Sequence, residues 1–145
     1  MDFKTLSDTE VKSALELAWD VFQKYEAPDY SEEGMNTFHG CLKDADFTSM
    51  LKCYGAFDGT KIVGMIATRS EGTHIALFFV NGSYHKHGIG KKLFSMACAD
   101  NKSGTFTVNS SPYATEVYHH LGFIDTDTQK VQDGLIFTPM VCKFK

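Results

Sequence analysis

The sequence predicts a single domain, residues 1–145, of the α/β (α+β) class. Short apolar or alternating runs typical of strands are interspersed with longer runs in which apolar residues recur every three or four positions, as in amphipathic helices. Their order is strand, two helices, three strands, helix, strand, helix and two strands, which mixes hairpins with two crossover helices. A chain of 145 residues with 43% hydrophobic residues can bury one sizeable core.

The first third of the chain is expected to form a short strand and two helices. Residues 2–6 alternate as a strand does, and Ser7 and Glu10 have the spacing of a capping box that begins a helix to about residue 25. Pro28 stops this helical pattern. Ser31, followed by two glutamates, then starts a second helix that runs to about residue 43.

The remainder of the chain is expected to contain six strands and two further helices. Asp58-Gly59 is a strong hairpin turn, and Gly64 in the strand after it suggests a bulge or a close approach. Pro112 suits the first turn of a helix, and Gly122 suits the end of one. The expected strands are 51–57, 61–70, 75–80, 105–108, 123–124 and 135–143, with a polar turn at 129–134, and the expected helices are 112–121 and one from about 89 to a turn at 102–104.

Charge is unevenly distributed along the chain. The net charge of −4 argues against a nucleic-acid-binding surface. Residues 1–50 hold eleven acids and four bases, whereas residues 51–145 hold seven acids and ten bases. This division suits a cationic substrate on one side and a phosphate-bearing cofactor on the other, with ordinary surface charge as the alternative. We expect the acidic and aromatic elbow at 25–34 to select the substrate.

The sequence contains no pattern typical of a metal site or a membrane segment. Cys41, Cys53, Cys98 and Cys142 are scattered, with no C-x-x-C pair and no signal peptide ahead of them, and the histidines lack zinc-ligand spacing. No apolar run approaches the roughly 20 residues that span a bilayer. We therefore expect a cytoplasmic protein without a metal, a membrane partner or a nucleic-acid partner; a homodimer stays open.

The most informative stretch is the polar turn after the apolar strand 75–80. Gly88 and Gly90 lie where a helix begins, and the first N–H groups of a helix form an anion site that glycines leave open to a phosphate. Lysines surround the same turn: Lys86, Lys91 and Lys92. The turn is not a P-loop, because Lys92 stands where that motif needs Ser or Thr. We predict that the turn binds a pyrophosphate; an ordinary glycine-rich turn is the alternative.

The pattern His85-x-x-Gly88-x-Gly90 resembles the acyl-CoA signature of the GNAT superfamily of N-acyltransferases, usually written Gln/Arg-x-x-Gly-x-Gly/Ala. His85 stands where the family has Gln or Arg. The order of the expected elements is also that of the GNAT fold, so the resemblance covers nearly the whole chain. It implies a mixed, mostly antiparallel sheet of about seven strands, splayed after the fourth to admit the pantetheine arm, and about four flanking helices.

A second segment, Asn109 to Phe123, resembles another family hallmark, Ala-x-x-x-Tyr-x-x-x-Gly-Phe after a strand that ends in Asn. In the family this Asn helps to bind coenzyme A and the Tyr lies near the thioester sulfur, which corresponds to Asn109 and Tyr118 here. A phenol with an unperturbed pKa near 10 keeps its proton at neutral pH and can give it to a departing thiolate. The resemblance thus implies Tyr118 as the general acid, the alternative being a core aromatic.

The cofactor implied by the resemblance is acetyl-CoA, used as the acyl donor. The residues implied in its binding, besides Asn109 and Tyr118, are Phe79, Val80, His85, Lys86, His87, Gly88, Ile89, Gly90 and Lys91.

The implied reaction is direct attack of a primary amine on the thioester, with a backbone N–H near Val80 stabilising the charge on the carbonyl oxygen. The amine must lose a proton, and three residues are candidates for the base: His74, Glu33 and Glu26, the glutamates acting through water. His74 is expected to share a strand face with Val80, and its pKa lies in the useful range. We name His74 and Glu33, with Tyr118, as the catalytic candidates.

The sequence thus predicts an N-acetyltransferase that acts on a small-molecule or peptide amine. Two other functions stay open. One is a non-catalytic CoA-binding regulatory domain of the same fold, which the lack of an obvious base favours and the presence of Tyr118 disfavours. The other is a nucleotide-phosphate-binding module, which would bind ATP about as well as coenzyme A.

Overall fold

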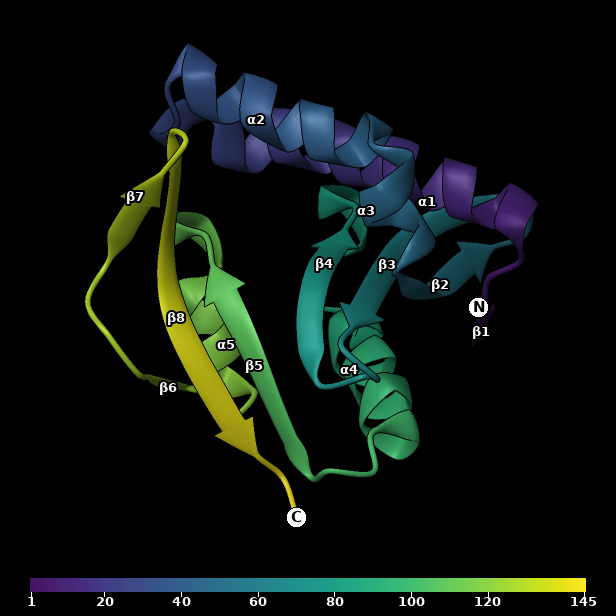
Figure 1. Ribbon diagram of the computed structural model, residues 1–145. Coiled ribbons are helices and arrows are strands. Elements are labelled where there is room, and N and C mark those ends of the chain that lie inside the picture. The colour runs from purple at the N-terminus through teal and green to yellow at the C-terminus, as the bar shows by residue number, and fades with distance from the viewer.

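The strands form one mixed sheet that opens in the middle. The computed structural model describes residues 1–145, with strands in the order β1-β2-β3-β4-β5-β8-β6 and with β7 paired to β8. Only β4 and β5 are parallel neighbours, and they diverge from each other (Figure 1). The strands are β1 (Asp2–Thr5), β2 (Lys52–Asp58), β3 (Lys61–Arg69), β4 (His74–Val80), β5 (Thr105–Ser110), β6 (Ile124–Asp125), β7 (Lys130–Gln132) and β8 (Leu135–Lys143).

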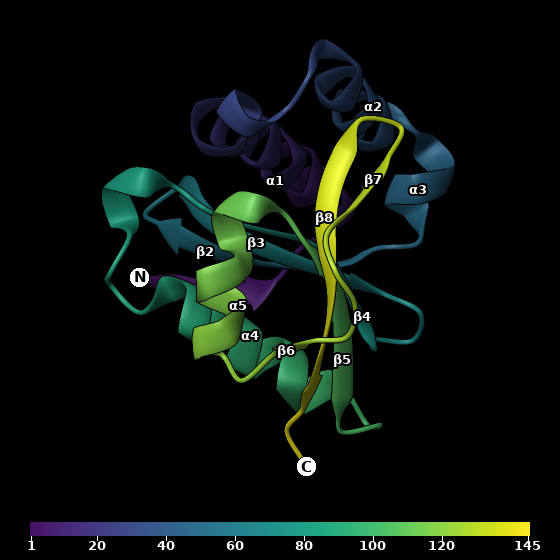
Figure 2. The ribbon, with the colours of Figure 1, turned by 90° about the vertical axis from the view of Figure 1, so that its left-hand side faces the viewer.

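Helices cover both faces of this sheet. Figure 2 shows α1 (Asp8–Val21) and α2 (Glu32–Lys43) over one face, and α4 (Ile89–Asp100) and α5 (Thr115–His120) over the other. A separate hydrophobic core lies on each side, because each face of the sheet buries its apolar side chains against its own pair of helices. The predicted fold class is confirmed.

The observed elements depart from the predicted ones in three places. The first helix ends at Val21 and continues as a π-helical turn, η1 (Phe22–Glu26), and a 3₁₀ turn, η2 (Ala27–Asp29). Residues 45–49 form an unpredicted helix, α3 (Ala45–Ser49), and β7 occupies half of the predicted turn 129–134, which narrows to Asp133-Gly134. Such segments are too short for a hydrophobic pattern to repeat several times, so the sequence pattern could not reveal them.

A β-bulge in β4 changes which side chains share a face. Ala76 is the extra residue, because the register with β3 runs from Ile75 directly to Leu77. Ile75 and Val80 both pack in the core beneath α4. Neighbouring residues on a strand face opposite sides, so His74 lies on the other face, toward α1 and α2. The prediction that His74 shares a face with Val80 was wrong, because an extra residue reverses the alternation.

Gly64 in β3 allows a close approach of α4, as the sequence predicted. A Cβ atom at Gly64 would lie 2.9 Å from Cγ2 of Ile89 and 3.2 Å from Cδ1 of Leu93. The beginning of α4 therefore packs directly on the backbone of β3, beside the end of β4.

Candidate functional site

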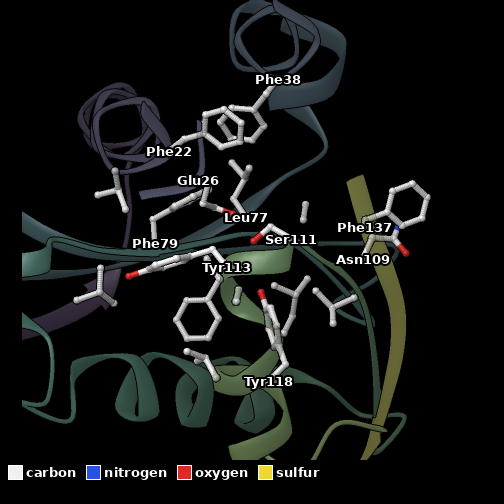
Figure 3. A pocket seen from close by; sticks show the side chains of 18 of the residues that line it. Phe22, Glu26, Phe38, Leu77, Phe79, Asn109, Ser111, Tyr113, Tyr118 and Phe137 are labelled. Carbon is white, nitrogen blue, oxygen red and sulfur yellow. The ribbon is translucent and has the colours of Figure 1, made fainter. Parts of the chain in front are cut away.

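A cavity of about 980 Å³ occupies the opening between β4 and β5. The two strands pair only at His74–Thr107 and Ile75–Val108, and beyond these positions their backbones separate. Residues from both faces of the sheet line the cavity, and Figure 3 shows its central part. We divide the cavity into two parts. The α4 half is lined by the turn 84–91, Val80 and α5. The α2 half is lined by η1, α2, α3, the face of β4 with Leu77 and Phe79, and the β7–β8 hairpin.

The α4 half contains the amino end of α4. Gly88, with φ of 77°, caps this helix in the left-handed conformation, and the first helical hydrogen bond runs from Lys92 N–H to the Gly88 carbonyl at 3.1 Å. The N–H groups of residues 89–91 thus have no partner within the helix, and the helix dipole adds positive potential there. Lys86 and Lys91 also line this half. The arrangement suits an anion such as a pyrophosphate.

The histidines of the turn differ in position. His85 Nε2 lies 2.9 Å from the Val80 carbonyl oxygen, and because that oxygen can only accept, Nε2 carries the proton. The ring of Tyr25, from η1, packs beside His85 with 5.6 Å between ring centroids. His87 does not line the cavity, and Lys92 points elsewhere, with its Nζ 4.5 Å above the ring of Phe3.

The end of β4 presents a free main-chain donor to the opening. Asn81 N–H donates to the Val63 carbonyl at 2.8 Å, on the β3 side. Since successive N–H groups of a strand point to opposite edges, the Val80 N–H points to the unpaired edge, where β4 and β5 have separated. A donor in this position can stabilise negative charge on a carbonyl oxygen in the opening.

Tyr118 stands in the wall of the cavity where the two halves meet. Only 6% of its surface is exposed, and its ring packs edge-on against Phe78 and Phe123. Its hydroxyl makes no hydrogen bond within the protein and points into the cavity (Figure 3). Burial, with a contribution from the Glu26 carboxylate, raises the pKa of Tyr118 above its ordinary value. The hydroxyl is therefore a proton-bearing donor at every physiological pH.

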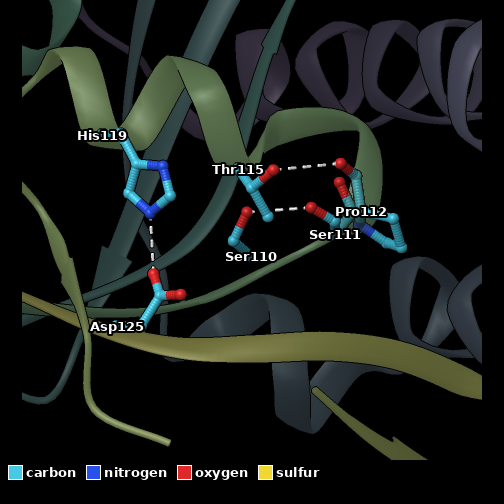
Figure 4. Close-up of polar contacts among 6 residues, drawn as sticks. All are labelled: Ser110, Ser111, Pro112, Thr115, His119 and Asp125. Atoms are coloured by element: carbon cyan, nitrogen blue, oxygen red, sulfur yellow. Dashed lines mark hydrogen bonds and ion pairs between the residues drawn. The ribbon is translucent and has the colours of Figure 1, made fainter. Parts of the chain in front are cut away.

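Short polar contacts hold the segment that carries Tyr118. Ser110 Oγ donates to the Ser111 carbonyl at 2.9 Å, and Thr115 Oγ1 donates to the Pro112 carbonyl at 3.3 Å (Figure 4). At the other end of α5, His119 Nε2 lies 2.7 Å from a carboxylate oxygen of Asp125 in β6. The first two contacts order the turn between β5 and α5, and the third joins α5 to β6.

The α2 half has aromatic walls around one buried carboxyl group. Phe22 and Phe38 stack with 4.1 Å between centroids, and Phe38 packs against Phe79. Glu26, the last residue of η1, is 7% exposed and points into this half (Figure 3). Burial raises the pKa of Glu26 to about 7, the Ser111 hydroxyl opposes this rise, and Asp29 adds to it. Glu26 therefore exchanges a proton near neutral pH.

Ser111 presents a buried hydroxyl to the same space. Its Oγ has no hydrogen-bond partner in the protein, yet it is close enough to the Glu26 carboxyl to lower that group's pKa. A buried polar atom without a protein partner is commonly satisfied by water or by a ligand. Ser111 and Glu26 therefore form the polar end of an otherwise apolar chamber.

The other predicted site residues lie farther from Tyr118. His74 is at the closed end of the opening, with Nδ1 2.8 Å from Thr107 Oγ1, and burial and Arg69 lower its pKa to about 4. Glu33 is exposed in the first turn of α2 and does not line the cavity. Asn109 lines the cavity from β5, where its amide makes no protein hydrogen bond. The expected elbow reaches the cavity through Glu26 and Tyr30 instead of through Glu33.

The sequence named Glu26 as an alternative but gave no sign that it is buried. A π-helical turn changes which residues face the core, and π-helical turns are common at functional sites. Ser111 was not predicted at all, because only the separation of β4 from β5 exposes it to the cavity.

Comparison with known proteins identifies the fold. The sequence model described as "Acetyltransferase (GNAT) domain" matches residues 26–144. A GCN5-related N-acetyltransferase from Rhodopseudomonas palustris is 18% identical with a TM-score of 0.81, over 98% of this chain and 94% of that one. The PaiA N-acetyltransferase from Thermoplasma acidophilum, solved with coenzyme A, is 19% identical with a TM-score of 0.72, over 99% and 100% of the two chains. GCN5 from Tetrahymena is 16% identical with a TM-score of 0.68, over 100% and 97%.

No curated protein matches the sequence. None of the helices combines the length and the apolar character needed to cross a bilayer. No three His, Cys, Asp or Glu side chains gather as a set of metal ligands.

Proposed function

Because the chain belongs to the GNAT family of acetyltransferases, we propose that it transfers the acetyl group of acetyl-CoA to a primary amine. One observation carries the proposal. A single cavity runs through the opening between β4 and β5, with unpaired helix N–H groups in its α4 half and a buried carboxyl group of pKa about 7 in its α2 half. Donor and acceptor can thus enter from opposite faces of the sheet and meet at Tyr118.

The α4 half suits the acyl donor. The N–H groups of residues 89–91, with Lys86 and Lys91, would bind the pyrophosphate, and the pantetheine arm would lie in the opening beside β4. The thioester carbonyl oxygen would then lie near the Val80 N–H, which supports the negative charge that develops during attack. Asn109 and the turn residues around His85 complete the proposed donor site.

The α2 half suits the acceptor amine, and Glu26 would accept its proton. A base works best when its pKa lies near the operating pH, which holds for Glu26 and not for His74 with a pKa of about 4. The amine nitrogen forms a bond to the carbonyl carbon, and its surplus proton passes to Glu26, directly or through a water molecule at Ser111. Glu26 later releases this proton to solvent.

The departing sulfur would lie beside Tyr118. The carbon–sulfur bond breaks and the electron pair leaves with the sulfur as a thiolate. Because burial raises the pKa of Tyr118 above its ordinary value near 10, a thiolate of pKa about 8.5 does not remove its proton fully. We therefore assign Tyr118 the donation of a hydrogen bond to the leaving thiolate, which takes its proton from solvent. This replaces the full proton transfer expected from the sequence.

Coenzyme A binding to a glycine variant tests the donor half. Gly88→Glu would put a carboxylate and a side chain into the space before α4, so its affinity for coenzyme A in calorimetry should fall at least tenfold. Gly59→Glu is the matched control, because Gly59 also has a positive φ and open space but lies in the β2–β3 turn. Equal affinity of the two variants would contradict the proposed donor site.

Free-thiol release from acetyl-CoA with a panel of primary amines tests the reaction. Amine-dependent release supports the transferase. Coenzyme A binding without release from any amine favours the regulatory domain, and ATP binding as tight as that of coenzyme A favours the nucleotide-binding module. A cytoplasmic location and a homodimer stay predictions from the sequence.

A further inference from the structure

Arg69 lies at the far end of the α2 half and has no partner within the protein. It is the only arginine of the chain, and it is the last residue of β3. It lines the cavity and is partly buried, but its guanidinium makes no ion pair and no hydrogen bond. The four ion pairs of the protein all involve other residues, at the surface.

The guanidinium of Arg69 is partly exposed and has no counter-ion, so its N–H donors stay open to water or to an anion. Its planar fork of N–H donors matches a carboxylate, which can accept two parallel hydrogen bonds. Asp44 is near the Arg69 end but forms no ion pair with it, and Asp133 is exposed at the hairpin turn. The cavity wall contains the carboxyl groups of Glu26 and Asp133, but neither forms an ion pair with Arg69, so an anion in the cavity could reach it.

The charge of Arg69 acts on this end of the cavity. Burial lowers the pKa of His74, and Arg69 lowers it further, so the imidazole is uncharged at neutral pH. Burial and Asp44 raise the pKa of the Cys41 thiol, and Arg69 opposes that rise. Both neighbours are therefore neutral, and Arg69 is the one cation in the α2 half. The neutral His74 leaves Nε2 free for a second hydrogen bond, since Nδ1 is taken by Thr107.

The two ends of the α2 half lie at different positions along β5. Arg69 is the register partner of His74, which in turn pairs with Thr107. Ser111, beside Glu26, follows Thr107 by four residues, which corresponds to roughly 13 Å along an extended chain. The wall between these ends is mainly apolar and aromatic; it includes Phe38, Phe47, Leu77, Leu135 and Phe137.

From this arrangement we infer that the acceptor is an amine with a carboxylate at the other end of an apolar linker several carbon atoms long. The amine lies by Glu26 and Ser111, where it meets the thioester, and the carboxylate lies on Arg69, with His74 as a second donor. The inference rests on the proposed function and adds the acceptor class. It narrows the cationic or amine-bearing acceptor expected from the acidic first part of the chain to one that also carries a carboxylate.

Chemical modification of Arg69 tests the anion site without any turnover. Phenylglyoxal condenses with guanidinium groups, and in this chain the resulting mass gain reports on Arg69 alone, with Arg69→Lys as the blank. We expect 6-aminohexanoate to slow the modification at least tenfold in the presence of coenzyme A, and n-hexylamine to leave the rate unchanged. Equal rates with the two probes would overturn the inference.

The second measurement is the rate at which the protein acetylates 6-aminohexanoate and n-hexylamine. Wild-type kcat/KM should be at least tenfold higher for 6-aminohexanoate than for n-hexylamine, and Arg69→Gln should abolish this preference through KM. Lys12→Gln, the same loss of charge on the exposed side of α1, should keep it. Acetylation of n-hexylamine at an equal or higher rate would overturn the inference and leave the transferase intact. Protection of Arg69 without release of thiol from any amine would overturn the transferase and leave Arg69 as part of a carboxylate-binding site only.

Discussion

The two halves of the cavity perform matched tasks but are constructed differently. The α4 half comes from one continuous stretch, the end of β4, the turn and the start of α4, and its binding groups are main-chain N–H groups. The α2 half is assembled from η1, α2, α3, β3, β4 and the β7–β8 hairpin, and its polar groups are separate side chains, among them Glu26, Ser111 and Arg69.

This difference predicts how each half responds to change. Main-chain donors persist when side chains are replaced, so the α4 half should tolerate most substitutions other than those that fill the space at Gly88. The α2 half depends on individual side chains held between elements distant in sequence. Tyr30 donates to the Ile136 carbonyl at 2.9 Å, Thr37 donates to the Asp133 carbonyl at 2.6 Å, and the backbones of Gly34 and Gly134 lie against each other. Single substitutions should thus alter the chemistry and the specificity more readily in the α2 half than in the α4 half.

The largest effect is expected from removing the base in the α2 half. Glu26→Gln should lower kcat/KM about 10²- to 10⁴-fold, the range for a lost general base. In the wild type, kcat/KM should rise with pH to a plateau above an apparent pKa of about 7, because only ionised Glu26 accepts a proton, and the variant should lose this dependence. Glu33→Gln is the control and should keep both the rate and the profile. A wild-type profile in Glu26→Gln would assign the proton to another group.

Glu26→Gln should lower the activity but raise the free energy of unfolding at high pH. The pKa of Glu26 rises from 4.5 to about 7 on folding, so between these values the folded state binds more protons and loses stability as pH increases. The cost reaches about 3 kcal/mol above pH 7. Glu26→Gln should match the wild type near pH 4 and exceed it by about that amount at pH 8, measured by urea unfolding. A constant difference across this range would mean that Glu26 is not buried in solution.

A smaller effect is expected where the halves meet. Tyr118→Phe removes one hydrogen bond to a charged sulfur, worth about 1.5–3 kcal/mol, so kcat should fall roughly 10- to 100-fold. The KM for acetyl-CoA should stay near the wild-type value, because the ring still fills its place between Phe78 and Phe123. Tyr54→Phe, at a buried tyrosine that does not line the cavity, serves as the control. An unchanged kcat under rate-limiting chemistry would make Tyr118 a core residue.

The smallest effect concerns the acidic elbow outside the cavity. Glu32 and Glu33 are exposed in the first turn of α2. Replacing both with Gln should change the KM of the acceptor by no more than about twofold, because surface charges in water contribute little. The charge distribution of the sequence alone predicts a larger increase in KM. The double variant therefore distinguishes selection of the acceptor by surface charge from selection inside the cavity.

Much of the fold and of the α4 half could be predicted from the sequence, because they depend on neighbours along the chain. The strand, the glycine turn and the helix that follows it are contiguous, and so are Asn109 and Tyr118 with their helix. Hydrophobic periodicity and helix-end chemistry operate over about ten residues, which a sequence displays directly.

Tertiary structure alone decided the chemistry of the α2 half. The carboxyl group of Glu26 has a pKa of about 7 because other segments bury it away from water. The sequence does not show which of the eleven acids in residues 1–50 is buried. The bulge at Ala76 turned His74 away from Val80, and the pairing of β4 with β5 at two positions only opened the space that Ser111 and Glu26 share. Burial, register and strand separation depend on how distant segments pack, so they appear only when the chain is folded.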